Sequence, residues 1–299
     1  MHSRYMTPAV TVFDASGKLD IEGNLSLYAS LKPYVSGFII MGSTGEFFAL
    51  DMETSRRLIK TASQFSRGEM KAYAGASRMN IDECIELANY AYDCGLDGVM
   101  IISPWYFRLN EQDTYHFYSK IAQSTPANIF IYNFPDRTGY SISPALCLRL
   151  ARENKNIIGF KDTITDTLHT SEIIRLVKSE LPYFQVYAGY DNNFVHNILS
   201  GGDGCIGGLS NICPEFFHHW MNALQKKDLA LIAEYQKNVD ILMDIYAIND
   251  PFVPTLKKVL KQRGIIQSDR CTAPFDTIKT DQTESVQKIL SRIGIDINA

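Results

Sequence analysis

Apolar runs rich in β-branched and aromatic residues recur along the chain, and helical patterns lie between them. Eight such runs follow one another at a spacing of about 20 to 35 residues, which is the repeat expected of βα units. The runs are VTVFD (10–14), GFIIMGS (37–43), KAYAGAS (71–77), GVMIISP (98–104), NIFIYNF (128–134), IIGFKDT (157–163), FQVYAGY (184–190) and GCIGGLS (204–210). Their continuous apolar character indicates a parallel sheet that is covered on its outer face. Eight βα units close into a barrel, so the sequence predicts an α/β fold of the (β/α)8 TIM-barrel type.

Helical patterns lie between these runs and continue after the eighth run. The segment 143–156 begins with Ser143 as an N-cap and has Pro144 at the first helical position. Beyond the eighth run the strand pattern ends, helical patterns continue, and no Pro/Gly/Ser-rich linker intervenes. We therefore predict a catalytic barrel over residues 1–224 and a C-terminal helical region over residues 225–299 that packs on the barrel.

Charge and hydropathy argue against several classes of partner. A formal net charge of −4 and a pI near 5.9 disfavour a nucleic acid or an anionic membrane. No window approaches the ~20 apolar residues of a membrane span, and the start, MHSRYMTPAVTVFD, lacks the apolar core of a signal peptide. We therefore expect a cytoplasmic protein. The six cysteines form no C-x-x-C pair and lie at no metal-site spacing from a histidine, so we expect neither a disulfide framework nor a metal site.

Polar residues follow the predicted strands, and active sites of (β/α)8 barrels form at the C-terminal strand ends. One of these residues is Lys161, which ends the sixth run although lysine is seldom buried. Burial favours the neutral amine, and a neutral amine can attack a ketone to form a Schiff base, whose protonated imine withdraws electrons. The alternative is a lysine that pairs with Asp162 or with another carboxylate at the rim.

Two further segments carry candidate site residues. In GSTGEFF, glycines on both sides of Ser43 and Thr44 let the backbone turn sharply and present N–H groups and hydroxyls to a small carboxylate. A plain βα turn is an equally good interpretation of that segment. In IYNFPDRTG, Tyr132 could relay protons and Arg137 could bind an acid group bidentately. The alternative there is a proline-containing loop with a surface arginine.

Taken together, these segments resemble the dihydrodipicolinate synthase and N-acetylneuraminate lyase superfamily of pyruvate-dependent class I aldolases. The resemblance covers essentially the whole chain. Its carriers are GSTGE (42–46), SPWY (103–106), YNFPDRTG (132–139), GFKDT (159–163), AGYD (188–191) and GGDGCIGGLSN (201–211). It implies a Schiff-base lyase that needs no metal or diffusible cofactor, and a homotetramer built as a dimer of dimers.

The resemblance also implies roles for individual residues. Lys161 matches the lysine that forms the Schiff base, and Tyr132 matches the tyrosine that transfers the proton. Ser43 and Thr44 match the pair that holds the pyruvate carboxylate. Tyr106 matches a tyrosine that reaches into the neighbouring subunit's site and completes a relay with Ser43 and Tyr132. The other expected substrate-binding positions are Gly189, Ile206, Arg137, Thr163, Asp191 and Gly208.

The identity of the substrate is less closely defined. The overall pattern resembles aldolases that reversibly cleave a 2-keto-3-deoxy sugar acid to pyruvate and a hydroxyaldehyde, and we favour this activity. The first alternative is a dihydrodipicolinate (4-hydroxy-tetrahydrodipicolinate) synthase that condenses pyruvate with aspartate semialdehyde, because Arg137 lies where those synthases bind the distal carboxylate. The second is an N-acetylneuraminate lyase, although Asn192 and Gly208 replace an acid and a serine of that pattern. The non-enzyme alternative is a silent pyruvate-binding protein.

Overall fold

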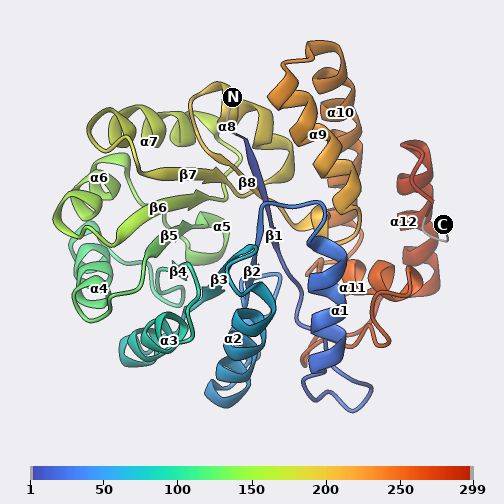
Figure 1. The fold of residues 1–299 in the computed structure, drawn as a ribbon, viewed down its shortest axis with the longest axis horizontal. Coiled ribbons are helices and arrows are strands. Elements are labelled where there is room, and N and C mark those ends of the chain that lie inside the picture. The colour runs from blue at the N-terminus through green and yellow to red at the C-terminus, as the bar shows by residue number, and fades with distance from the viewer. Residues whose placement is uncertain (1–2, 297–299) are drawn as a thin grey trace.

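Eight parallel strands close into a barrel in the computed structural model, which describes residues 3–296 (Figure 1). Neighbours in the barrel follow the chain order, and β8 returns to pair with β1. The strands are β1 (Arg4–Pro8), β2 (Gly37–Ile40), β3 (Lys71–Gly75), β4 (Gly98–Ile102), β5 (Ile129–Asn133), β6 (Ile157–Asp162), β7 (Gln185–Ala188) and β8 (Gly204–Ile206). This arrangement confirms the predicted (β/α)8 fold.

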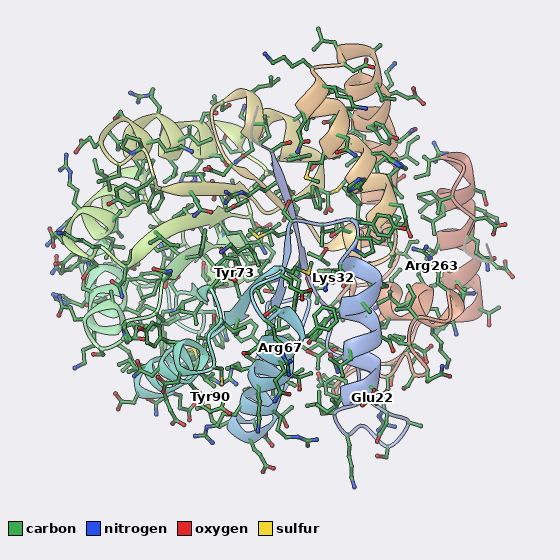
Figure 2. All side chains as sticks on the ribbon, viewed as in Figure 1. Glu22, Lys32, Arg67, Tyr73, Tyr90 and Arg263 are labelled. Atoms are coloured by element: carbon green, nitrogen blue, oxygen red, sulfur yellow. The ribbon has the colours of Figure 1, made fainter. Side chains whose placement is uncertain are left out.

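Helices cover the outside of the barrel. They are α1 (Ile21–Leu31), α2 (Met52–Ser66), α3 (Ile81–Asp93), α4 (Glu111–Gln123), α6 (Pro144–Glu153), α7 (Thr167–Glu180) and α8 (Phe194–Leu199). The short helix α5 (Pro135–Thr138) and the 3₁₀ turns η1 (Phe47–Ala49), η2 (Asp191–Asn193) and η3 (Gly208–Asn211) instead follow strands β5, β2, β7 and β8 at their carboxyl ends. The predicted N-cap Ser143 accepts a hydrogen bond from the Leu146 N–H at the start of α6. Charged side chains such as Glu22 and Arg67 project from the outer helices, whereas Tyr73 lies inside the ring (Figure 2).

Aromatic side chains fill the middle of the barrel. The ring of Phe130 lies 5.3 Å from that of Tyr73 and 5.9 Å from that of Tyr187, measured between centroids. All three are buried and belong to one apolar core that continues into the layer between strands and helices. Because these rings close the interior, the carboxyl ends of the strands are left as the place for a cavity.

The first strand is not the one that the apolar pattern predicts. β1 is RYMTP, in which Met6 pairs with Gly37 of β2 and with Ile206 of β8. The predicted strand VTVFD is buried, but its N–H groups bond to side chains: Val10 N–H to Asn211 Oδ1 at 3.1 Å and Val12 N–H to Asn24 Oδ1 at 3.2 Å. The prediction for residues 10–14 is therefore wrong, because an apolar run reports burial and not strand pairing.

The C-terminal region is helical and lies along one side of the barrel (Figure 1). Its elements are α9 (Pro214–Lys226), α10 (Leu229–Leu242), η4 (Met243–Ala247), α11 (Val253–Gln262) and α12 (Thr280–Arg292). α9 contacts β1, and both α9 and α11 contact η3. The boundary predicted at residues 224 and 225 falls inside α9 and stays a prediction. Residues 1–2 and 297–299 of the predicted ranges lie outside the described residues.

Candidate active site

Lys161 and Tyr132 lie side by side at the carboxyl ends of β6 and β5. The two strands pair so that these residues are level with each other, and level residues on neighbouring strands point to the same face. Lys161 Nζ lies 4.2 Å from the centroid of the Tyr132 ring. The lysine is 5% exposed, so its amine is held in a largely dehydrated position.

The neighbouring carboxylate of Asp162 is engaged on the opposite side of β6. It accepts hydrogen bonds from Asn133 Nδ2 at 2.8 Å and Thr170 Oγ1 at 2.7 Å, and it pairs with His169 Nδ1 at 2.8 Å. The Nε2 atom of His169 lies 3.0 Å from the carbonyl oxygen of Ile142. Acceptors at both ring nitrogens fit the doubly protonated imidazolium. The carboxylate of Asp162 is thus occupied by the helix layer and turned away from Lys161.

The imidazole of His169 has a perturbed acidity that agrees with this geometry. Burial is the largest single influence and lowers the pKa of His169. The hydrogen bond and the negative charge of Asp162, with the Ile142 carbonyl, outweigh burial, so the pKa of His169 is raised overall. The structure therefore pairs the imidazole of His169 with a buried carboxylate directly behind the strand that carries Lys161.

The loop after β2 brings Ser43 and Thr44 to the same strand ends. Met41 and Glu46, on either side of the pair, have φ angles of 53° and 58°, so the loop turns through the left-handed region twice. Ser43 Oγ lies 3.5 Å from the hydroxyl oxygen of Tyr132. The tight turn that the GSTGEFF segment predicts is present, and it presents two hydroxyl groups beside Tyr132.

Glu46 anchors this loop to the C-terminal region. Its carboxylate forms an ion pair with Lys257 of α11, and both side chains are fully buried. The Oε2 atom also accepts hydrogen bonds from the N–H of Thr272 at 2.6 Å and from its Oγ1 at 2.8 Å. Lys257 Nζ donates a further bond to the carbonyl of Arg270 at 2.9 Å. The glutamate of GSTGE is thus a buried structural contact, for which the sequence analysis had no role.

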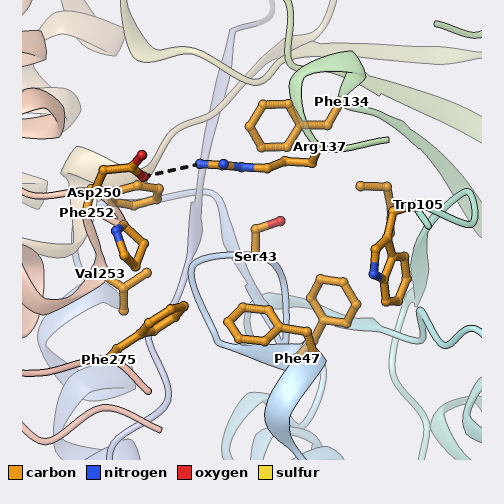
Figure 3. A pocket seen from close by; sticks show the side chains of 12 residues that line it. Ser43, Phe47, Trp105, Phe134, Arg137, Asp250, Phe252, Val253 and Phe275 are labelled. Atoms are coloured by element: carbon orange, nitrogen blue, oxygen red, sulfur yellow. Dashed lines mark ion pairs between the residues drawn. The ribbon is translucent and has the colours of Figure 1, made fainter. Parts of the chain in front are cut away.

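Two cavities meet above these residues. The inner cavity, of about 170 Å³, contains Lys161 in its wall. Nine of the eleven predicted site residues line it: Ser43, Thr44, Tyr132, Arg137, Lys161, Thr163, Gly189, Ile206 and Gly208. The outer cavity, of about 400 Å³, is largely aromatic, with Phe47 and Trp105 on one side and Phe252 and Phe275 on the other (Figure 3). Both cavities share Arg137 and Ser43, so they form one continuous site.

Two predicted residues do not line the inner cavity. Tyr106 follows β4 and is 78% exposed, with its ring 4.9 Å from that of Phe107. Asp191 is fully buried behind the wall, where it accepts hydrogen bonds from the hydroxyls of Tyr5 at 2.5 Å and Tyr246 at 2.6 Å. Burial raises the pKa of Asp191, and the two tyrosine donors oppose that rise. The structure thus places Asp191 against two tyrosines and not against the cavity.

The sequence analysis missed the residues that the C-terminal region contributes. Tyr246, Asp250 and Phe252 line the inner cavity. Asp250 reaches Arg137 from the opposite wall, with 3.8 Å between the carboxylate and the guanidinium (Figure 3). The guanidinium also lies 5.6 Å from the centroid of the Phe134 ring. None of the three was predicted as a site residue, because their approach to the barrel depends on how the C-terminal region packs.

Neither a membrane-spanning helix nor a metal-ligand cluster is found among the described residues. Within residues 3–296, none of the helices is long and apolar enough to cross a membrane. In the same described range, no three or more His, Cys, Asp and Glu side chains are grouped so that they could hold a metal ion.

A (β/α)8 barrel with a buried lysine, a tyrosine and two hydroxyl side chains around one cavity defines a class of protein suited to bind a small carbonyl compound. The chain belongs to the dihydrodipicolinate synthetase family, whose model matches residues 1–293.

Individual relatives resemble the chain over almost its whole length. The "Putative 2-dehydro-3-deoxy-D-gluconate aldolase YagE" of Escherichia coli K12 is 31% identical over 289 residues, 96% of each chain. The "Probable 2-dehydro-3-deoxy-D-pentonate aldolase YjhH" of the same strain is 31% identical over 98% of each chain. A 4-hydroxy-tetrahydrodipicolinate synthase of Kosmotoga olearia is 32% identical over 87% of this chain and 88% of its own.

A solved structure extends the likeness to three dimensions. The crystal structure of YagE in complex with pyruvate superimposes with a TM-score of 0.94 at 30% identity. The match covers 97% of this chain and 98% of YagE. The fold of the chain is therefore that of the family throughout, including the helical region that contributes to the cavity.

Proposed function

We propose that the protein is a class I aldolase that reversibly cleaves a 2-keto-3-deoxy sugar acid to pyruvate and a hydroxyaldehyde. The observation that carries the proposal is the buried amine of Lys161, which opens on the inner cavity beside Tyr132. The names of YagE and YjhH, which refer to 2-dehydro-3-deoxy sugar acids, support this substrate class.

The proposed reaction begins at the keto carbon of the substrate. The Nζ of Lys161 attacks this carbon as the free amine, and Tyr132 donates its phenol proton to the departing oxygen, so that water leaves and a protonated imine remains beside the phenolate of Tyr132. The imine withdraws electrons from the bond between C3 and C4 of the substrate, so that this bond breaks. Tyr132, beside Ser43, accepts the proton of the C4 hydroxyl as the aldehyde forms. The enamine left on Lys161 takes that proton at C3, and water then releases pyruvate.

Ser43 and Thr44 are proposed to hold the carboxylate of the keto acid. Both line the inner cavity with Lys161, and the turn around them offers two hydroxyls and the N–H groups of a sharply bent backbone. Neutral donors of this kind bind a carboxylate without placing another cation beside the amine. The mechanism uses no metal and no diffusible cofactor, because the imine itself accepts the electrons.

A synthase that uses aspartate semialdehyde is the second candidate. It is favoured by Arg137, whose side chain lines both cavities and could bind a distal carboxylate. Asp250 competes for the same guanidinium, however, because the two charged groups already lie 3.8 Å apart. No observation of this kind favours an N-acetylneuraminate lyase, because Asn192 and Gly208 lack the acid and the hydroxyl of that pattern. No specific observation favours the silent pyruvate-binding protein either.

Two measurements on the purified protein test the proposal. Incubation with pyruvate and borohydride should fix a pyruvate adduct on Lys161, detected by intact mass, and Lys161→Arg should give none. A screen of aldehydes with pyruvate should then show condensation with short hydroxyaldehydes. Condensation with aspartate semialdehyde alone would establish the synthase instead. A folded protein without an adduct would overturn the aldolase and favour the silent pyruvate-binding protein.

The subunit organisation and the location in the cell are also part of the proposal. We propose a homotetramer, built as a dimer of dimers, in which Tyr106 enters the site of a second subunit. Its 78% exposure at the end of β4 supports this, because an aromatic side chain so placed is free to contact another chain. We also propose that the protein acts in the cytoplasm.

A further inference from the structure

The C-terminal region supplies a polar group to the inner cavity. Tyr246 of η4 lines this cavity together with Lys161. Its ring packs edge-on against Phe252 at 4.8 Å between centroids, which fixes the direction of the phenol. A Cβ atom on Gly208 would lie 2.7 Å from the Tyr246 hydroxyl, so glycine leaves the room that the phenol occupies. The hydroxyl of Tyr246 is thus held in one place in the cavity wall.

The hydroxyl of Tyr246 donates a hydrogen bond to the buried carboxylate of Asp191. Tyr246 donates to Asp191 Oδ2 at 2.6 Å, while Oδ1 accepts hydrogen bonds from the Tyr5 hydroxyl at 2.5 Å and the Leu209 N–H at 3.2 Å. Burial is the largest influence and raises the pKa of Asp191, whereas these three donors oppose the rise by stabilising the carboxylate. A carboxylate only accepts hydrogen bonds, so each tyrosine must point its proton toward Asp191. The backbone of Gly208 also donates to the phenol oxygen, which leaves one lone pair of that oxygen as an acceptor for a group in the cavity that Tyr246 lines.

Thr163 supplies a second hydroxyl group to the inner cavity. Thr163 lines the inner cavity, and its Oγ1 is buried with no hydrogen-bond partner among the described residues. Unpaired buried hydroxyls are costly, and in binding sites the ligand commonly pairs them. The wall that contains Tyr246 is therefore suited to a ligand that carries hydroxyl groups.

We propose that Tyr246 determines specificity by accepting a hydrogen bond from a chain hydroxyl of the substrate. This inference rests on the proposed aldolase function. It narrows the aldehyde substrates to those that carry a hydroxyl group on the carbon next to the carbonyl. The carboxylate of Asp191 strengthens the acceptor, because a phenol that donates to an anion has more electron density on its oxygen. The same negative charge disfavours an acidic group at this wall.

Tyr5 provides a matched control for the experiment. It donates to the same carboxylate as Tyr246, but it lies behind the wall and does not line either cavity. Tyr246→Phe removes the hydroxyl that faces the substrate, whereas Tyr5→Phe removes only a hydrogen bond to Asp191. Comparing the two variants therefore separates contact with the substrate from general weakening of the tyrosine–aspartate cluster.

The measured quantity is the discrimination between aldehydes that differ by one hydroxyl. For each protein, kcat/KM for condensation with pyruvate is measured with glyceraldehyde and with 3-hydroxypropanal, and again with glycolaldehyde and with acetaldehyde. Tyr246→Phe should lower the preference for the more hydroxylated member of each pair by roughly fivefold to tenfold, the loss of one hydrogen bond. Tyr5→Phe should keep the wild-type preference.

An unchanged preference in Tyr246→Phe, or an equal change in Tyr5→Phe, would overturn the inference. The adduct of pyruvate with Lys161 is measured in the same preparations. If the wild-type protein forms no adduct, the proposed function fails. If it forms the adduct while Tyr246→Phe discriminates as the wild type does, only the role of Tyr246 fails. Should Tyr246→Phe not fold, Gly208→Ala displaces the same hydroxyl and should lower the same preference.

Discussion

At the scale of single residues, the amine of Lys161 and the hydroxyl of Tyr132 perform different parts of the proposed reaction. The amine bonds covalently to the keto carbon, whereas the hydroxyl moves protons as the imine forms and again as the bond between C3 and C4 breaks. Lys161 Nζ lies 4.2 Å from the centroid of the Tyr132 ring, and both residues line the inner cavity, so one bound keto acid can reach both groups. Removing either group should therefore stop the reaction at a different step.

We expect Tyr132→Phe to lower kcat by about 10²- to 10⁴-fold, the range typical of lost general acid–base catalysis. Pyruvate and borohydride should still mark Lys161 in this variant, because the ring that lies against the amine remains. Steady-state kinetics and intact mass check the two expectations separately. Turnover close to that of the wild type would show that another group transfers the proton.

His169 gives the protein a pH-dependent contribution to stability. Its pKa is raised in the folded chain by Asp162, with Asp166 as a more distant negative neighbour, although burial opposes the shift. A raised pKa means that the folded state holds the proton more tightly than the unfolded state does. The contribution is therefore complete below the ordinary histidine pKa of about 6.5 and is lost as the pH rises through the raised value.

The free energy of unfolding should accordingly fall as the pH rises through this window, measured by urea denaturation at closely spaced pH values. His169→Gln cannot take up the proton, so it should remove this part of the pH dependence. The exposed His116 offers a control, since His116→Gln should leave the slope unchanged. A slope that survives in His169→Gln would assign the pH dependence to other groups.

At the scale of elements, the loop after β2 and helix α11 depend on each other through a fully buried ion pair. Breaking a buried pair by removing one partner leaves an uncompensated charge, which costs about 3–5 kcal/mol. Lys257→Met should therefore lower the free energy of unfolding by about that amount. It should also raise KM for pyruvate, because Glu46 belongs to the loop that presents Ser43 and Thr44.

The neighbouring Lys258 is a control for the loss of a lysine from the same helix. Its amine lies 3.4 Å from Asp269, its side chain is partly exposed, and such a pair contributes about 0–1 kcal/mol. Urea unfolding of Lys257→Met and Lys258→Met, with pyruvate kinetics on both, measures the difference. Equal effects would mean that the Glu46–Lys257 pair does not anchor the loop.

The double variant Glu46→Gln/Lys257→Met should recover part of the stability that Lys257→Met loses, since neither charge remains.

The elements of the barrel could be predicted from the sequence to the extent that burial and pairing coincide. The seven runs from GFIIMGS onward contain β2 to β8, because each of those buried runs also pairs on both sides. The run VTVFD is equally apolar but pairs with side chains, so the pattern misplaced β1. Local capping signals are more direct: Ser143 caps α6 because its side chain bonds within the same turn.

The site was predictable where strand ends carry it. Lys161, Tyr132 and Ser43 follow strands, and the barrel necessarily brings those ends together. Tyr246 reaches the cavity from η4 and Asp250 from the segment between η4 and α11, and neither has a fixed position relative to a strand, so no spacing in the sequence predicts their approach. Asp191 follows a strand, as expected, but it does not line the cavity, because its carboxylate accepts hydrogen bonds from Tyr5 and Tyr246 behind the wall.

At the scale of the whole molecule, the exposed aromatic pair after β4 supports the proposal that a second subunit completes the site. Tyr106 and Phe107 are 78% and 72% exposed, whereas the adjoining Trp105 lines the outer cavity. Large apolar side chains left in solvent are typical of surfaces that another chain covers. Because the two residues directly follow Trp105 in the chain, we propose that a second subunit docks beside the outer cavity and exchanges tyrosines with the first.

Mixed assemblies test this exchange directly. Lys161→Arg and Tyr106→Phe should each be nearly inactive alone, but a mixed dimer has one site with an intact Lys161 and a Tyr106 from its neighbour. Random co-assembly should then restore about a quarter of the wild-type turnover, since about half of the pairs are mixed and each has one complete site. Co-assembly of Tyr106→Phe with the double variant Lys161→Arg/Tyr106→Phe is the control and should restore nothing, because neither chain supplies the tyrosine. If mixing the two single variants restores no more than this control does, Tyr106 acts within its own chain or not at all.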